Sequence, residues 1–269
     1  MRERTIIGIL AVLALVLGGC DEKPRNENVS GIQSGNGPTV SAGQFHNEVL
    51  AAFEKRAPLD SVTGMRWEEW QETILASIEE ASAAHDIPFD REQTLSEMEN
   101  LLRAFHALET ATGVDPGMLH TSESPEADFA ILVGQLREWK LIDERTRRSL
   151  VELNLDESAA RASATTDEEM RDVYDIGAAS REFWAEQAKK KDIGPRIVPP
   201  DEDQPCKVCQ YGSALSDMLG AVVGRFFCLG EPNCPARTAA MASLIFNMIM
   251  EYCANHNCNG DDFGPPLFP

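Results

Sequence analysis

The sequence lacks the short motifs that mark the common enzyme classes. It contains no Gly-x-Ser-x-Gly elbow, no phosphate-binding loop, no dinucleotide fingerprint and no His-Glu-x-x-His pair. Catalytic residues scattered along a chain leave no such motif, so an unrecognised enzyme stays an alternative. We expect a non-catalytic protein, with no catalytic residue, cofactor or metal to name.

Positive charge is also scarce. The chain has 24 Lys and Arg against 44 Asp and Glu, a net charge of -20. Proteins bind nucleic acid by placing Lys and Arg on phosphates, so the acidic balance argues against a nucleic-acid partner. It also opposes attraction to an anionic membrane surface. Most of the acid excess is expected to lie on solvated helix faces.

Alternation of apolar and polar residues, which predicts strands, is absent, and no repeat of 20 to 50 residues is visible. Apolar residues instead recur at three and four, which predicts an all-α fold with five or six helices before residue 190. Start and stop signals support it, including Asp90 with Gln93, Ser124 before Pro125, and Gly113 as a stop. Thr166 with Glu169 repeats the capping-box pattern.

The N-terminus reads as an export signal. Arg2 and Arg4 precede an uncharged apolar run that is short for a membrane span, which needs about 20 residues. Leu17-Gly18-Gly19-Cys20 resembles the lipobox of bacterial lipoproteins, and this resemblance implies that Cys20 is acylated and becomes the new N-terminus. The alternative is an uncleaved anchor helix over residues 5–19. In enteric lipoproteins an aspartate such as Asp21 implies retention at the inner membrane.

These signals divide the chain into six segments. Both readings of the N-terminus place the remainder outside the cytoplasm, facing the periplasm or the exterior. In the favoured reading, lipid on Cys20 holds the protein at the membrane. The predicted segments are a signal peptide (1–19), a flexible tether rich in Gly, Asn, Ser and Pro (20–43), an acidic helical bundle (44–190), a linker (191–205), a cysteine-rich helical hairpin (206–258) and a tail (259–269).

Six of the seven cysteines fall in the predicted hairpin, with two equal gaps of 18 residues between them. Two antiparallel helices, each about 28 Å long, would bring the cysteines together in nested pairs. The predicted disulfides are Cys206 with Cys258, Cys209 with Cys253, and Cys228 with Cys234. Gly220-x-x-x-Gly224 offers a strip of small residues for close helix packing, and the two helices are apolar over more than one face, so they must pack against further elements.

Other roles for "CKVC" remain open. A tetrathiolate zinc site is one, with His256 nearby, but its second half would be C-x4-C and export favours disulfides. A redox pair would need a βαβ setting, and covalent haem would need His where Gln210 stands. The nested order resembles the saposin-like family and, more loosely, the cysteine-rich helical bacteriocins. Either resemblance implies a lipid-interacting module, although saposin-like modules have more helices.

The remaining candidates for chemistry or recognition are few. His106 and Glu109 share a helix face and could ligate a metal, as could His85 with Glu79 or Glu80, and His120 with Asp115. Bundle metal sites draw ligands from several helices, so ordinary hydrogen bonding is the favoured interpretation. Trp67 and Trp70 are expected in the core. The favoured function is a membrane-anchored envelope lipoprotein, a binding or structural protein with a possible protein partner there.

Overall fold

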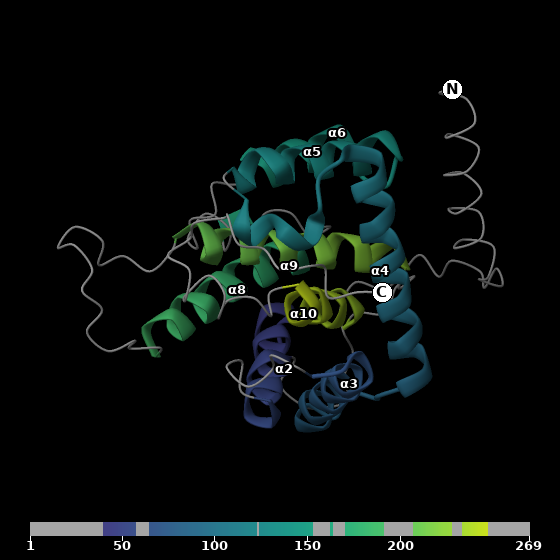
Figure 1. Ribbon diagram of the computed structural model, residues 1–269, viewed down its shortest axis with the longest axis vertical. Coiled ribbons are helices and arrows are strands. Elements are labelled where there is room, and N and C mark those ends of the chain that lie inside the picture. Colours follow the sequence, from purple (N-terminus) through teal and green to yellow (C-terminus); the bar gives the residue numbers. More distant parts are fainter. Residues whose placement is uncertain are drawn as a thin grey trace.

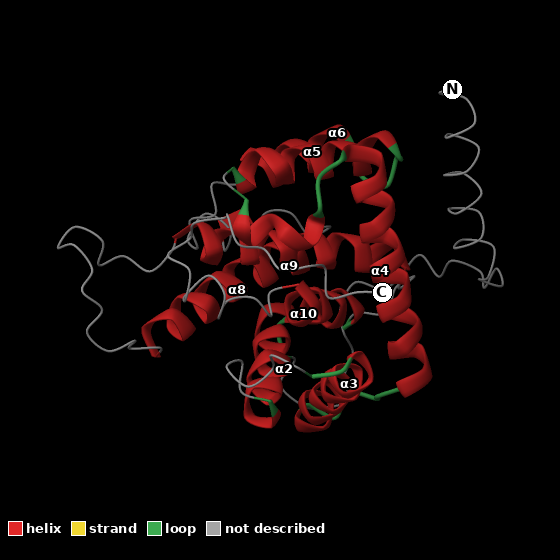
Figure 2. Ribbon diagram, viewed as in Figure 1, coloured by secondary structure: helices red, strands yellow, loops and turns green. Residues whose placement is uncertain are grey.

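The computed structural model describes residues 40–57, 65–122, 124–152, 162–163, 170–190, 207–227 and 233–246. Within these ranges the regular elements are all helices and no strand occurs, which confirms the all-α prediction for the described residues (Figure 2). In chain order they are α2 (Ala42–Arg56), α3 (Trp67–Ala84), α4 (Arg91–Thr112), the 3-10 helix η1 (Pro116–Thr121), α5 (Pro125–Glu138), α6 (Glu144–Glu152), α8 (Arg171–Lys190), α9 (Lys207–Phe227) and α10 (Cys234–Phe246).

The helix ends follow local sequence signals. An Asp90 side-chain oxygen accepts a hydrogen bond from the Gln93 backbone N–H at 3.0 Å and caps the start of α4. Gly113 ends the same helix with a φ of 74°, a left-handed conformation that suits glycine. Pro125 opens α5 directly after Ser124. The predictions for Asp90, Gly113 and Pro125 are confirmed, and Ser124 holds the N-cap position without a side-chain cap hydrogen bond. The Thr166 signal lies outside the described residues.

Helix α9 lies in the middle of the molecule. It crosses the centre of Figure 1, and it packs most extensively against α10, α8 and η1. Every residue from 212 to 224 is buried. A helix that is buried on all sides belongs to the interior of a protein. The prediction that the C-terminal helices pack against further elements is therefore confirmed for the described part of α9.

Small residues let α10 approach α9 closely. A Cβ added to Gly224 would lie 1.9 Å from Thr238 Oγ1, and one added to Gly220 would lie 2.6 Å from the Ala242 Cβ. A real Cβ could not occupy either position without a shift of the neighbouring helix. The predicted small-residue strip is thus the contact line between α9 and α10. The paired positions run in opposite directions along the chain, so the two helices are antiparallel.

One hydrophobic cluster contains residues from both predicted domains. It joins Phe45, Ile74 and Leu101 of the acidic region to Met218 and Ala239 of the C-terminal helices. The boundaries predicted at 190 and 206 stay a prediction, but the two regions share this core. Helix α2 begins at Ala42, so the last two residues of the predicted tether are helical. The signal peptide, the linker and the tail lie outside the described residues.

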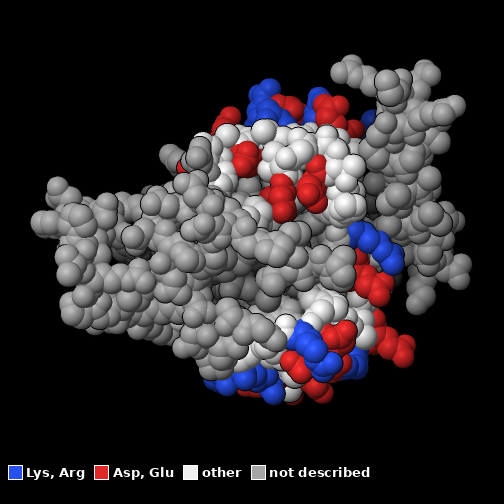
Figure 3. All heavy atoms as spheres, viewed as in Figure 1, with Lys and Arg blue, Asp and Glu red and all other residues white. Residues whose placement is uncertain are grey.

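Many of the charged side chains lie on the periphery. In Figure 3, carboxylates and basic groups are intermingled over α5 and α6 at the top and over α3 and the start of α4 at the lower right. Exposed ion pairs there include Arg91 with Glu72 and Arg137 with Glu138. No helix among the described residues is both long enough and apolar enough to cross a membrane.

Candidate functional site

The cysteines fall mostly outside the described part of the chain. Cys20, Cys206, Cys228, Cys253 and Cys258 lie there. Cys209 is on α9, and Cys234 is the first residue of α10. Cys234 is fully buried. The nested pairing therefore remains a prediction.

Two histidines that were candidates for metal binding form ordinary side-chain contacts. His106 is 81% exposed, and its Nδ1 lies 3.6 Å from Glu109 Oε2 on the same helix. His85, at the end of α3, contacts Glu48 of α2 through its Nε2. This contact joins two helices, which the sequence pattern around His85 did not indicate.

The other candidates on this list are structural in the described residues. Trp70 is buried and packs edge to face on Phe53 with ring centroids 4.6 Å apart, while Trp67 is half-buried against the core. Asp115 caps η1 by accepting the Gly117 backbone N–H at 2.8 Å. Burial raises the pKa of Asp115, and this hydrogen bond opposes the rise. The side chain of His120 is outside the described set.

A buried polar cluster lies where α2, α8, α9 and α10 meet. His46 Nε2 is 3.2 Å from Asp217 Oδ2, a contact of ion-pair length without the alignment of a hydrogen bond. The Ser180 hydroxyl donates to the same oxygen at 2.5 Å, and the Ser243 hydroxyl does so at 3.0 Å. All four residues have no exposed surface. We refer to these residues as the His46–Asp217 cluster.

The His46–Asp217 cluster contains the residue types of a hydrolytic triad in a different arrangement. In a triad the histidine stands between the serine and the aspartate, because it must accept the serine proton. Here the aspartate stands in the middle and both serines donate to it. The complete burial of all four side chains also closes the cluster to a substrate. The arrangement fits a structural network rather than nucleophilic catalysis.

One feature of the sequence, the position of Asp217, indicates a buried polar contact in this region. Asp217 is the one carboxylate within the apolar segment "SALSDMLGAVV" of α9, and it is fully buried. A single acid inside a helix with no polar face requires a buried partner, because an unpaired buried charge is costly. That partner, His46, is 171 positions away in the chain, so its identity depends on the fold.

A groove runs along the surface between α2 and α8, with a volume of about 550 Å³. Its α2 wall includes Gln44, Asn47 and Ala51, and its α8 wall includes Ala179 and Phe183. Among the described residues, five carboxylates line it and no Lys or Arg does. These carboxylates are Glu48, Glu54, Asp175, Glu182 and Glu186. We call this surface the α2–α8 groove.

Several carboxylates of the groove are fixed by hydrogen bonds. Asp175 Oδ2 accepts the Gly43 backbone N–H at 2.7 Å, and Glu54 accepts a bond from the Gln187 amide at 2.8 Å. Glu182 and Glu186, on the α8 wall, are exposed. Fixed carboxylates beside a half-buried aromatic ring can hold a cationic group and its aliphatic stem. The groove is therefore suited to a positively charged ligand.

Asp172 stands one turn before Asp175 on α8. Burial raises the pKa of Asp172, and the nearby Arg225 of α9 opposes this rise. The charge of Asp175 adds to the rise. Burial, more than the neighbouring negative charge, therefore favours the neutral form of Asp172.

A second buried charge pair joins α4 to α10. Arg237 donates from Nε to Glu97 Oε2 at 3.0 Å and from an Nη to Glu97 Oε1 at 2.7 Å. Both side chains are less than one-tenth exposed. Two parallel bonds of this kind fix orientation as well as distance. The pair holds α10 against α4. Its arginine does not line the α2–α8 groove.

In the part of the chain that the structure describes, no three His, Cys, Asp or Glu side chains come together as a metal-binding set. The predicted zinc alternative for "CKVC" stays a prediction, because Cys206, Cys253 and Cys258 lie outside the described residues. No protein-family model matches the chain, and no curated protein or solved structure does so either.

Proposed function

We propose that this chain is a membrane-anchored lipoprotein of a bacterial envelope and that its helical part is a non-catalytic binding protein. The anchoring rests on the resemblance of Leu17-Gly18-Gly19-Cys20 to a lipobox after a basic and apolar leader. Two or more acyl chains on Cys20 give stable attachment without a spanning helix. Asp21 favours the inner membrane. The binding role rests on the α2–α8 groove.

The binding role is supported by the charge of this groove, because the described ionisable side chains that line it are all acidic. Five carboxylates, with no basic residue among the described lining, create a negative field in a hollow, and this field attracts and orients a positively charged partner. The exposed Glu182 and Glu186 face solvent, while Phe183 supplies apolar surface. We therefore propose that the partner is a protein with a basic segment that lies along the groove.

The burial of α9 and α10 weighs against the saposin-like and bacteriocin-like alternative. A lipid-active helical module needs an apolar face that can reach a bilayer. Residues 212–224 of α9 and 234–245 of α10 are instead buried in the core. No arrangement in the described residues favours the enzyme alternative, since the His46–Asp217 cluster is closed to solvent.

The predicted disulfides belong to the same proposal, and the helix register supports them. From Gly224 to Gly220 the chain moves four residues back along α9, while the facing position moves four residues forward from Thr238 to Ala242. If the same register continued toward the loop, Cys228 would face Cys234. If it continued the other way, Cys209 would face Cys253, with Cys206 and Cys258 beyond them. Three nested disulfides would lock α10 against α9.

The disulfide scheme is tested by proteolysis of the unreduced full chain followed by mass spectrometry. We expect cross-linked peptides that join Cys206 to Cys258, Cys209 to Cys253, and Cys228 to Cys234. A local Cys206–Cys209 bond, or free thiols with bound zinc, would contradict the scheme. This result is independent of the anchor and of the groove.

The anchor is tested by expressing the full-length chain in a bacterial host and analysing its N-terminal peptide. We expect a chain that begins at Cys20, carries acyl groups there and sediments with membranes. The Cys20→Ala variant should keep residues 1–19 and carry no acyl group. A chain that keeps Met1 and an unmodified Cys20 would contradict lipidation and favour an uncleaved anchor helix.

The groove is tested with an oligolysine peptide as the probe and the full chain as the receptor. The variant Glu182→Gln/Glu186→Gln removes two charges from the groove, and Glu126→Gln/Glu138→Gln removes two exposed charges from α5. We expect the first variant to bind the probe several-fold more weakly than wild type and the second to bind it almost unchanged. Equal losses in both variants would show binding to overall charge and would contradict a groove site.

A further inference from the structure

The hydrogen bonds around His46 indicate which atoms of the His46–Asp217 cluster carry a proton. The Asn47 amide nitrogen donates to the Ala179 backbone carbonyl at 2.9 Å, which turns the Asn47 Oδ1 toward His46. This oxygen lies 2.9 Å from His46 Nδ1. An amide oxygen can only accept a hydrogen bond, so His46 Nδ1 must carry a proton.

The other ring nitrogen faces a carboxylate. A neutral imidazole has a single N–H, and here it is used at Nδ1. Nε2 would then turn a lone pair toward Asp217 Oδ2 at 3.2 Å, with both atoms buried. Two acceptors at that distance repel one another unless a proton lies on one of them. The pair therefore needs a second proton, on Nε2 or on the carboxyl.

The serines decide which atom holds this proton. Ser180 and Ser243 both donate to Asp217 Oδ2, and hydrogen bonds to an ionised carboxylate stabilise the charged form. We propose that His46 and Asp217 form a buried imidazolium–carboxylate pair, and that its proton makes the attachment of α2 to α8, α9 and α10 dependent on pH.

The direction of the pH effect follows from proton counting. A histidine in the unfolded chain releases its proton near about pH 6.5, whereas the folded pair retains one between Nε2 and Oδ2. The folded state then binds more protons than the unfolded state above that pH, so stability falls as the pH rises. Loss of the proton removes the positive charge of His46 from beside the buried carboxylate, which weakens the contact that α2 makes through His46.

Two other ionisable groups on the surrounding helices have described partners. Asp175 of α8 accepts from the Gly43 N–H and so also holds α2. On α10, Arg237 is bound by Glu97 of α4. Tyr174 of α8 is buried, Arg225 stands in the last turn of α9, and Glu48 on α2 pairs with His85 after α3. His85 is partly exposed and serves as the control histidine.

The consequence reaches the surface because α2 is one wall of the α2–α8 groove. Asn47, which orients the His46 ring, also lines that groove. Loss of the proton would loosen the wall on which Asn47 and Glu48 stand. The shape of the groove is thus coupled to the protonation of a pair that lies behind it and is closed to solvent.

The direct test is nuclear magnetic resonance of the full chain with nitrogen-15 in its five histidine rings. The His46→Gln variant assigns the His46 signals. If this variant fails to fold, contacts of the ring with Asn47 in the wild type assign them instead. We expect both His46 ring nitrogens to be protonated at about pH 8, where a free histidine is neutral. A neutral ring protonated only at Nδ1 would overturn the proposal.

A second test compares urea unfolding of the full chain at about pH 6 and about pH 9. For the wild type we expect the ratio of folded to unfolded protein to fall about tenfold or more over this range. The fall should be clearly smaller in His46→Gln and in Asp217→Asn, and it should persist in the control His85→Gln. Equal falls in wild type and in both cluster variants would overturn the proposal.

Discussion

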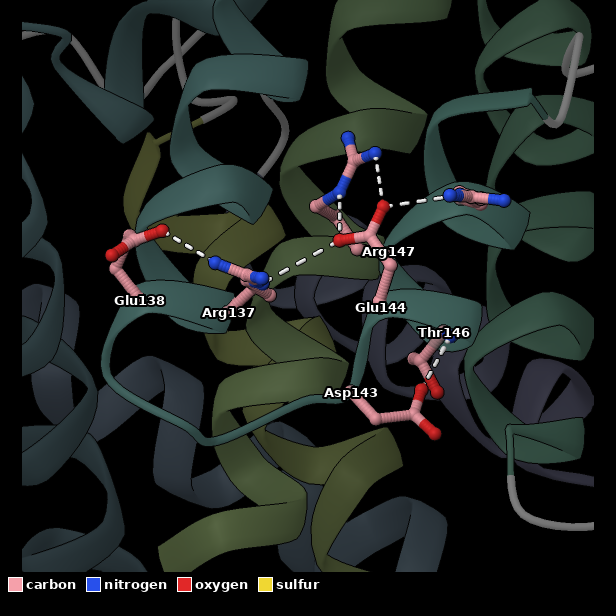
Figure 4. Close-up of polar contacts among 7 residues, drawn as sticks. Arg137, Glu138, Asp143, Glu144, Thr146 and Arg147 are labelled. Carbon is pink, nitrogen blue, oxygen red and sulfur yellow. Dashed lines mark hydrogen bonds and ion pairs between the residues drawn. The ribbon is translucent and has the colours of Figure 1, made fainter.

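Two pairs of helices joined by short connections differ in what holds them together. Helices α9 and α10 meet through glycine and small side chains inside the core, with Gly220 and Gly224 at the contact. Helices α5 and α6 meet at the surface through a network of charges (Figure 4). Glu144 accepts hydrogen bonds from Arg147 and Arg148 and lies 3.4 Å from Arg137, which also pairs with Glu138.

The two helix pairs are therefore expected to affect different properties: the buried contacts affect stability, and the exposed charges affect solubility. Buried charge pairs act in a medium of low dielectric, so breaking one lowers the free energy of unfolding strongly. Disrupting the close packing of the core also lowers it. Exposed ion pairs are screened by water and salt and contribute little. We therefore expect α9 and α10 to dominate the free energy of unfolding. The α5–α6 network instead keeps an acidic surface hydrated.

The largest effect is expected at the buried Glu97–Arg237 pair. Replacing Arg237 by Met leaves the Glu97 carboxylate buried without its partner, and this should lower the free energy of unfolding by about 3–5 kcal/mol. Urea unfolding monitored by circular dichroism measures the change. The double variant Glu97→Met/Arg237→Met removes both charges and should recover most of the loss. Arg148→Met, in the exposed network, should leave the unfolding midpoint unchanged, and a loss as large as that of Arg237→Met would contradict the comparison.

A smaller effect, of opposite sign in the two regions, is expected from adding one methyl group. Gly224→Ala places a Cβ against Thr238 and should destabilise the fold by about 1–3 kcal/mol. Gly134 on α5 has no atom within 4 Å of its added Cβ, so Gly134→Ala should stabilise the fold by about 0.5–1 kcal/mol. Thermal unfolding compares the two. Stabilisation by both changes would show that α9 and α10 are less closely packed than described.

The smallest effect concerns the acid titration of the exposed network. Hydrogen bonds from Arg147 and then Arg148 lower the pKa of Glu144 from 4.5 to about 2. Because the folded pKa is depressed, the stabilisation is present above pH 4.5 and is lost as the pH falls toward 2. In Arg147→Gln/Arg148→Gln the pKa should return toward its ordinary value. Carboxyl carbon shifts during a pH titration measure it, and an unchanged low pKa in this variant would contradict the assigned cause.

Local patterns predicted much of the fold because they act within a few residues. The cap at Asp90, the stop at Gly113 and the contact strip from Gly220 to Gly224 are written in adjacent turns of the chain. Helical periodicity, by contrast, indicates which face of a helix is buried and gives no information about what covers it. The central position of α9 therefore became visible only in the fold.

The sites depended still more on distant contacts. Asp217 was recognisable as an isolated acid in an apolar helix, but its partner His46 comes from the first described helix. The α2–α8 groove is formed by segments more than 100 residues apart, and each segment alone is an ordinary acidic helix. The spacing of His106 and Glu109 within one helix made them candidate metal ligands. In the structure they form an exposed pair on that helix.

The central claim is that the C-terminal helices form the interior of the acidic bundle rather than a separate lipid-facing unit. Hydrogen–deuterium exchange of the full chain, read by mass spectrometry, tests it most directly. Residues 212–224 of α9 should exchange more slowly than any part of α5 or α6, because their opening requires disruption of the shared core. Exchange of α9 as fast as that of α5 and α6 would contradict the claim.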